Sequence, residues 1–217
     1  MPDPILLSTW HFGLPANRAG WPYLLKAGGL VDGLEQTCVA CELDPAVDSV
    51  GVGGLPDASG EVSLDGAIML SPARSAGVGY VRNYAHPVSI ARRVMERSPH
   101  KLLVGEGAER FAKEQGFPTA ELLTEAARRK WEAWRATGAH LDFHVGERKA
   151  RLGEVSHDTI GVLAMDAAGR IGVACSTSGR AFKFPGRVGD SPLIGPGLYC
   201  DPRIGAAVAR VGGETKV

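Results

Sequence analysis

The chain has 217 residues, 44% of them hydrophobic, which suits one α/β domain with a substantial core or two small ones. Twenty-four lysine and arginine residues balance 24 aspartate and glutamate residues, which excludes a general electrostatic attraction to nucleic acid or to an anionic membrane. No apolar run reaches the ~18 residues that a membrane span needs, and residues 1–10 show no signal peptide, so we expect a cytoplasmic protein without a membrane anchor.

The N-terminal part of the chain predicts one strand, one long helix and a loop. Residues 5–8 are a short apolar run, typical of a buried strand. Apolar residues at helical spacing predict a helix over residues 17–42, with a weak point at Gly28 and Gly29. Residues 51–56 (GVGGLP) are rich in turn-forming residues and are expected to form a loop.

The middle of the chain predicts further short elements. Apolar patterning favours strands over residues 64–70 and 102–104 and helices over residues 87–97, 106–115 and 120–137. The first of these helices begins at a proline, which suits the first helical position. In the last, the expected inner face is formed by Leu123, Ala127, Trp131 and Trp134.

Four cysteines raise the question of a redox pair or a zinc site. Cys38 and Cys41 form a C-x-x-C, but no second pair of ligands follows at zinc-finger spacing. We therefore interpret them as small apolar residues on the buried face of a helix. Neither a metal ion nor another cofactor is expected.

The pattern changes sharply near residue 159. Residues 138–156 are polar and aperiodic, as in an exposed linker. Two apolar runs follow, at residues 159–166 and 171–177, joined by a turn that contains Gly169. They predict a β-hairpin that begins at Thr159.

Three short motifs surround this hairpin: residues 157–161 (HDTIG), 176–179 (STSG) and 186–192 (GRVGDSP). Several short segments precede these motifs, among them residues 8–10 (STW) and 49–51 (SVG). All the segments stand in the order that one known family shows. Together they resemble the glycosylasparaginase family of N-terminal-nucleophile hydrolases, from near the N-terminus to about residue 207.

The resemblance implies an α+β fold, a four-layer αββα sandwich with two antiparallel sheets between layers of helices. It implies one domain over residues 1–217, truncated at its C-terminus relative to the family. It also implies self-cleavage between Asp158 and Thr159 into an α chain (1–158) and a shortened β chain (159–217), and a dimer of cleaved αβ units.

The implied chemistry suits a threonine. A threonine hydroxyl needs a base beside it, and a threonine at a chain terminus supplies one as its own α-amine, with a pKa of roughly 7.7–8.0. Thr159 becomes terminal only when the preceding peptide bond breaks. By resemblance, Asp158 assists that cleavage and His157 helps to hold the strained turn.

The resemblance also assigns residues to a small-molecule substrate, glycosylated asparagine, whose hydrolysis releases aspartate and a glycosylamine. Arg187 would bind the α-carboxylate of the asparagine and Asp190 its α-ammonium, pairings that suit a guanidinium fork and a carboxylate. Thr177 would hydrogen-bond near Thr159. Trp10 and Ser49 would line the pocket.

One segment departs from the family pattern, since Arg210 and Val211 stand where a Thr-Gly pair would form the oxyanion hole. Removal of one oxyanion donor costs about 3–4 kcal/mol of transition-state stabilisation, so an inactive, binding-only variant is an alternative. A second alternative is a plant-type asparaginase or isoaspartyl dipeptidase, although those relatives usually carry glycine before the nucleophile. A third is a hydrolase that uses Cys175 with His157.

Overall fold

A six-stranded sheet forms the centre of the molecule. The computed structural model describes residues 2–138 and 159–208. The strand order is β1-β5-β6-β2-β3-β4, and all neighbours are antiparallel except β3 and β4. The strands are β1 (Ile5–Ser8), β2 (Leu64–Met69), β3 (Ser75–Val81), β4 (Leu102–Val104), β5 (Ile160–Met165) and β6 (Ile171–Thr177).

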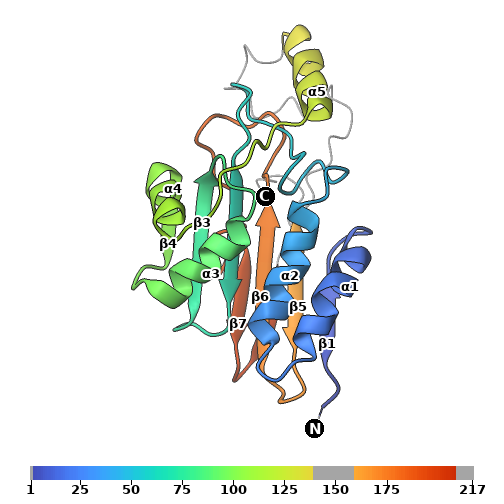
Figure 1. Ribbon diagram of the computed structural model, residues 1–217, viewed down its shortest axis with the longest axis vertical. Helices are drawn as coiled ribbons and strands as arrows, with labels where there is room; N and C mark the ends of the chain where they lie inside the picture. The colour runs from blue at the N-terminus through green and yellow to red at the C-terminus, as the bar shows by residue number, and fades with distance from the viewer. Residues whose placement is uncertain (1, 139–158, 209–217) are drawn as a thin grey trace, which may run out of the picture.

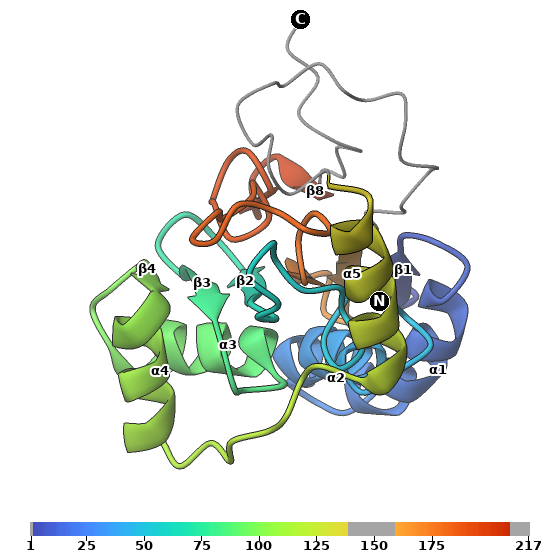
Figure 2. The same cartoon turned by 90° about the horizontal axis from the view of Figure 1, so that it is seen from above.

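Helices cover one face of this sheet and a small second sheet covers the other (Figures 1 and 2). The covering helices are α1 (Gly13–Leu24), α2 (Leu30–Glu42), α3 (Pro87–Arg97) and α4 (Gly105–Glu114), whereas α5 (Glu125–Ala136) lies beyond the ends of the strands, at the top of Figure 1. Helix α2 packs on β5 and β6, and α3 packs on β2 and β3. The opposite face carries β7 (Leu198–Asp201) and β8 (Gly205–Val208), an antiparallel pair that contacts β6.

The predicted combination of helices with a largely antiparallel sheet is confirmed. Of the four layers that the resemblance implies, the described residues form three: helices, the six-stranded sheet and the β7–β8 sheet. A fourth layer stays a prediction. None of the described helices has both the length and the hydropathy to cross a membrane.

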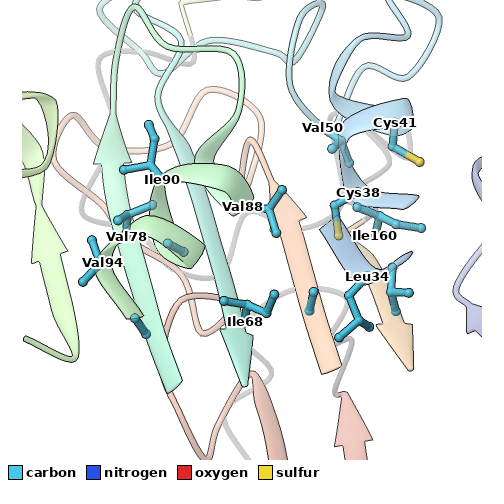
Figure 3. Close-up of a cluster of buried hydrophobic side chains, with 14 of the residues drawn as sticks. Leu34, Cys38, Cys41, Val50, Ile68, Val78, Val88, Ile90, Val94 and Ile160 are labelled. Carbon is cyan, nitrogen blue, oxygen red and sulfur yellow. The ribbon is translucent and has the colours of Figure 1, made fainter. Parts of the chain in front are cut away.

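The main core lies between α2, α3 and the sheet (Figure 3). Leu34 and Cys38 of α2 are fully buried, as are Ile68 of β2 and Ile160 of β5. Cys41 lies on the same buried face, so the prediction for the C-x-x-C pair is confirmed. Burial raises the pKa of the Cys41 thiol to about 12, and no group of three metal-binding side chains occurs within residues 2–138 and 159–208.

The single helix predicted over residues 17–42 is wrong, because two helices occupy this region and pack against each other. The break falls at the predicted weak point. Gly28 has a positive φ of 78°, which favours glycine. A Cβ atom on Gly29 would collide with the carbonyl oxygen of Tyr23, so this close approach also requires glycine.

The helix predicted over residues 120–137 begins later than expected. Its N-cap is Thr124, whose side chain accepts a hydrogen bond from the N–H of Ala127 at 3.2 Å. Ala127 and Trp134 are buried as predicted, whereas Trp131 is only partly buried. The other predicted strands and helices are found within one residue of their expected bounds, but β3, β7 and β8 were not predicted.

Candidate active site

The candidate site lies where the strands of the six-stranded sheet begin or end, at the upper ends of the strands in Figure 1. Strands β1 and β6 end there, while β5 and β2 begin there, because these neighbours are antiparallel. Thr159 directly precedes β5, and Thr177 is the last residue of β6. Since Ile160 pairs with Ser176, the two threonines lie at the ends of adjacent strands.

Thr9, just beyond the end of β1, fixes the backbone around Thr159. Its hydroxyl donates to the carbonyl oxygen of Thr159 at 2.8 Å and accepts from the N–H of Gly161 at 3.0 Å. The N–H of Thr9 in turn donates to the carbonyl oxygen of Gly161 at 3.0 Å. Thr9 therefore holds the carbonyl of the candidate nucleophile in a defined orientation.

The hydroxyl of Thr159 points to a second hydroxyl. Thr159 Oγ1 lies 3.4 Å from Ser191 Oγ, a long hydrogen-bond distance. Ser191 is buried, and its carbonyl oxygen accepts a hydrogen bond from Cys175 Sγ at 2.9 Å. Ser191 belongs to the GRVGDSP motif, but no sequence pattern predicts a role of its own for it.

Thr177 and Ser49 are brought together. Thr177 Oγ1 donates to the carbonyl oxygen of Ser49 at 3.3 Å and accepts from the N–H of Gly179 at 2.9 Å. The N–H of Ser178 donates to the same Ser49 carbonyl at 2.7 Å. Ser49 thus supports the end of β6 through its backbone. The predicted hydrogen bond of Thr177 near Thr159 stays a prediction.

Arg187 and Asp190 lie on the loop between β6 and β7, and both are half-buried. A Cβ atom on Gly179 would lie 3.0 Å from Arg187 Nη1, and one on Gly189 would lie 3.1 Å from it. The guanidinium group therefore passes close to the backbone just after β6, where Thr177 lies. Asp190 is also near β6, since the carbonyl oxygen of the next residue, Ser191, accepts a hydrogen bond from Cys175 of β6.

Of the remaining predicted site residues, the structure describes only Trp10. Trp10 follows Thr9 at the edge of the sheet with a half-buried side chain and an unusual positive φ of 66°. His157 and Asp158 lie outside the described residues. So do Arg210 and Val211, which stand at the expected oxyanion positions.

The geometry disfavours a cysteine nucleophile. Cys175 is buried beneath the sheet edge, and burial raises the pKa of its thiol well above the usual value. A nucleophilic cysteine needs the opposite shift, since the thiolate is the reactive form. Thr159, which is only partly buried, is the better candidate for attack on a carbonyl carbon.

Comparisons with known proteins agree with these motifs. The family described as asparaginase (Asparaginase_2) matches over residues 14–217. The N(4)-(beta-N-acetylglucosaminyl)-L-asparaginase of Elizabethkingia miricola is 45% identical over 211 residues, which cover 97% of this chain and 60% of that protein. The protein of the same name from Mus musculus is 35% identical, over 99% of this chain and 68% of its own length. A putative enzyme of the same name from Drosophila melanogaster is 34% identical, over 97% of this chain and 62% of its own length.

Proposed function

The chain belongs to the asparaginase family, and on that premise we propose that it is a self-cleaving amidohydrolase acting on the side-chain amide of glycosylated asparagine. The chain spans about three-fifths of the length of the relative from Elizabethkingia miricola. The observation that carries the proposal is the position of Thr159, clamped by Thr9 at a sheet edge beside Ser191.

The first proposed step releases the nucleophile. The hydroxyl of Thr159 attacks the carbonyl carbon of Asp158, the peptide C–N bond breaks, and an ester forms. Water then hydrolyses the ester, which leaves a free α-amine on Thr159 and a carboxylate on Asp158. Asp158 assists the attack, and His157 helps to hold the turn. The products are chains of residues 1–158 and 159–217 that remain one folded unit.

In the second proposed step the free α-amine takes the proton of the Thr159 hydroxyl, which attacks the side-chain amide carbon of the substrate. The glycosylamine leaves, and water releases aspartate from the β-aspartyl ester. Arg187 binds the α-carboxylate of the substrate, and Asp190 binds its α-ammonium group. Trp10, Ser49 and Thr177 line the same pocket.

The test is hydrolysis of glycosylasparagine by the purified chain, followed as released aspartate. The Arg187→Gln variant should raise KM by about tenfold to a hundredfold, because a charge-assisted pair with the substrate carboxylate is lost. Arg180→Gln, an exposed arginine on the same loop, is the matched control and should leave KM unchanged.

Assays with three substrates distinguish the proposed activity from those of plant-type asparaginases and isoaspartyl dipeptidases. Preference for glycosylasparagine over free asparagine and β-aspartyl dipeptides supports the proposal, and the reverse preference contradicts it. Aspartate binding without any turnover would identify a binding-only protein. Assembly into a dimer of cleaved αβ units and a cytoplasmic location stay predictions.

A further inference from the structure

A lysine ammonium group is buried beneath the candidate site. Lys183, on the loop that follows β6, is only 4% exposed, and its Nζ donates to the carbonyl oxygens of Ser63 at 3.1 Å and Ser178 at 3.0 Å. Burial lowers the pKa of this ammonium group, and the nearby charge of Asp65 raises it again. A buried charge is costly unless an opposite charge and hydrogen bonds compensate for it.

The carboxylate of Asp65 lies close to this ammonium group, because Lys183 binds the carbonyls of Ser63, two positions before Asp65, and of Ser178, which follows the strand partner of Asp65. Asp65 of β2 is fully inaccessible, and burial raises its pKa, whereas the charges of Lys183 and Arg187 lower it. Asp65 pairs in the sheet with Thr177, so this carboxylate is anchored directly beside the end of β6. Its Oδ1 also accepts a hydrogen bond from the N–H of Tyr80 at 2.8 Å.

These two residues hold both ends of one short segment, residues 183–190, here called the recognition loop. At its start, Lys183 is held by Ser63 and Ser178, and its own carbonyl oxygen accepts from the N–H of Ala58 at 2.9 Å. Near its end, the N–H of Gly189 donates to Asp65 Oδ2 at 3.3 Å. Arg187 lies between these two attachments.

We propose that Lys183 and Asp65 form a buried charge pair that positions the recognition loop, and through it the side chains of Arg187 and Asp190, for substrate binding. The inference rests on the proposed function of that site. Both are positioning residues, because the hydrogen bonds of Lys183 Nζ and of the Asp65 carboxylate run to backbone groups, while Arg187 and Asp190 would bind the substrate.

The test replaces the ammonium group by an apolar side chain of similar length, Lys183→Met. Thr9 holds the backbone around Thr159, and the contact of Thr159 Oγ1 with Ser191, just after the recognition loop, is long at 3.4 Å, so self-cleavage should persist. Displaced Arg187 and Asp190 side chains would lose charge-assisted contacts with the substrate, so KM for glycosylasparagine and Kd for aspartate should rise about 10- to 100-fold. Lys113→Met, an exposed lysine on α4, is the matched control.

The split between KM and kcat separates positioning from simple destabilisation. A variant that is only less stable loses active protein, which lowers the apparent kcat and leaves KM unchanged. Lys183→Met with wild-type KM and wild-type aspartate affinity would overturn the proposal. Raised KM and Kd with near-normal kcat per folded molecule would support it.

A second variant keeps the test decisive if Lys183→Met does not fold. Removing one member of a buried pair leaves an uncompensated charge, and removing both is less harmful. Asp65→Asn with Lys183→Met should therefore fold better than Lys183→Met alone, yet bind aspartate weakly. No recovery in the double variant would overturn the pairing.

Amide hydrogen exchange distinguishes failure of this inference from failure of the proposed function. Exchange in residues 183–190 should accelerate in Lys183→Met and not in the control, whether or not the protein hydrolyses anything. If the wild-type chain is inactive but exchange responds in this way, the loop anchoring stands and the proposed activity fails. Unchanged exchange overturns the anchoring.

Discussion

At the scale of single residues, Thr9 makes the most informative contact of the candidate site. Its hydroxyl bridges the carbonyl oxygen of Thr159 and the N–H of Gly161, two groups about 150 positions away in the chain. The sequence placed Thr9 in a motif but gave it no role, because the pairing of β1 with β5 is not visible in a local pattern. No role is predicted for Ser191 either, because its contact with Thr159 joins a loop to a residue 32 positions earlier in the chain.

We therefore predict that Thr9→Val, which keeps the shape and removes the hydroxyl, slows self-cleavage and costs about 1–3 kcal/mol of stability through two unsatisfied backbone groups. Time-resolved mass spectrometry follows the cleavage, and urea unfolding of the uncleaved Thr159→Ala background measures the stability. Thr119→Val, at an exposed threonine, is the control. Cleavage at the wild-type rate would show that the clamp does not orient the scissile region.

At the scale of elements, the junction of α2, α3 and β6 contains a buried titratable pair. Glu42, the last residue of α2, accepts from His86 Nδ1 at 2.9 Å and from Ser176 Oγ at 2.6 Å. It also accepts from the N–H of Val88 at 3.3 Å, in the first turn of α3, where a carboxylate is favourable. One side chain thus joins two helices to the strand that ends at Thr177.

This junction predicts a dependence of stability on pH. The hydrogen bond to Glu42 raises the pKa of His86, and burial raises that of Glu42, so the folded chain holds protons to higher pH than the unfolded chain. The contribution of His86 is complete below the unfolded histidine pKa of about 6.5 and is lost as pH rises through the higher folded pKa. The contribution of Glu42 is complete only below the unfolded glutamate pKa of about 4.3 and is lost as pH rises through its own raised folded pKa. Both contributions to stability therefore decrease as pH rises.

Thermal unfolding between mildly acidic and mildly alkaline pH should accordingly show Tm falling as pH rises. His86→Gln should reduce this slope, because glutamine does not titrate, whereas His100→Gln, at an exposed histidine, should retain it. An unchanged slope in His86→Gln would mean that other groups control the pH dependence.

Helices and strands were predictable from the sequence where nearby residues determine their bounds. Pro87 fixes the start of α3, and the apolar runs of β5 and β6 flank a turn at Gly169. Strand β3 was missed because its sequence, SAGVGYV, contains small residues that dilute the apolar pattern. The start of α5 was placed too early because the cap at Thr124 outweighed the helical propensity of the residues before it.

At the scale of the whole molecule, the sheet order could not be obtained from local pattern. Strand β2 lies beside β6, more than 100 residues later in the chain, and this pairing brings Asp65 to Thr177. The family resemblance supplied the expectation of a largely antiparallel sheet with helices, which the structure confirms. The burial of Lys183 beneath the site follows from packing between distant segments, which no local sequence pattern indicates.

The central claim is that Thr159 is a nucleophile released by self-cleavage. Intact-mass analysis of the purified chain, with N-terminal sequencing of any fragment, tests it most directly. We predict two chains, one of residues 1–158 and one that begins at Thr159, and a single uncleaved chain for Thr159→Ala. A wild-type chain that stays intact at 217 residues would contradict the account, since no free α-amine would then activate the hydroxyl of Thr159.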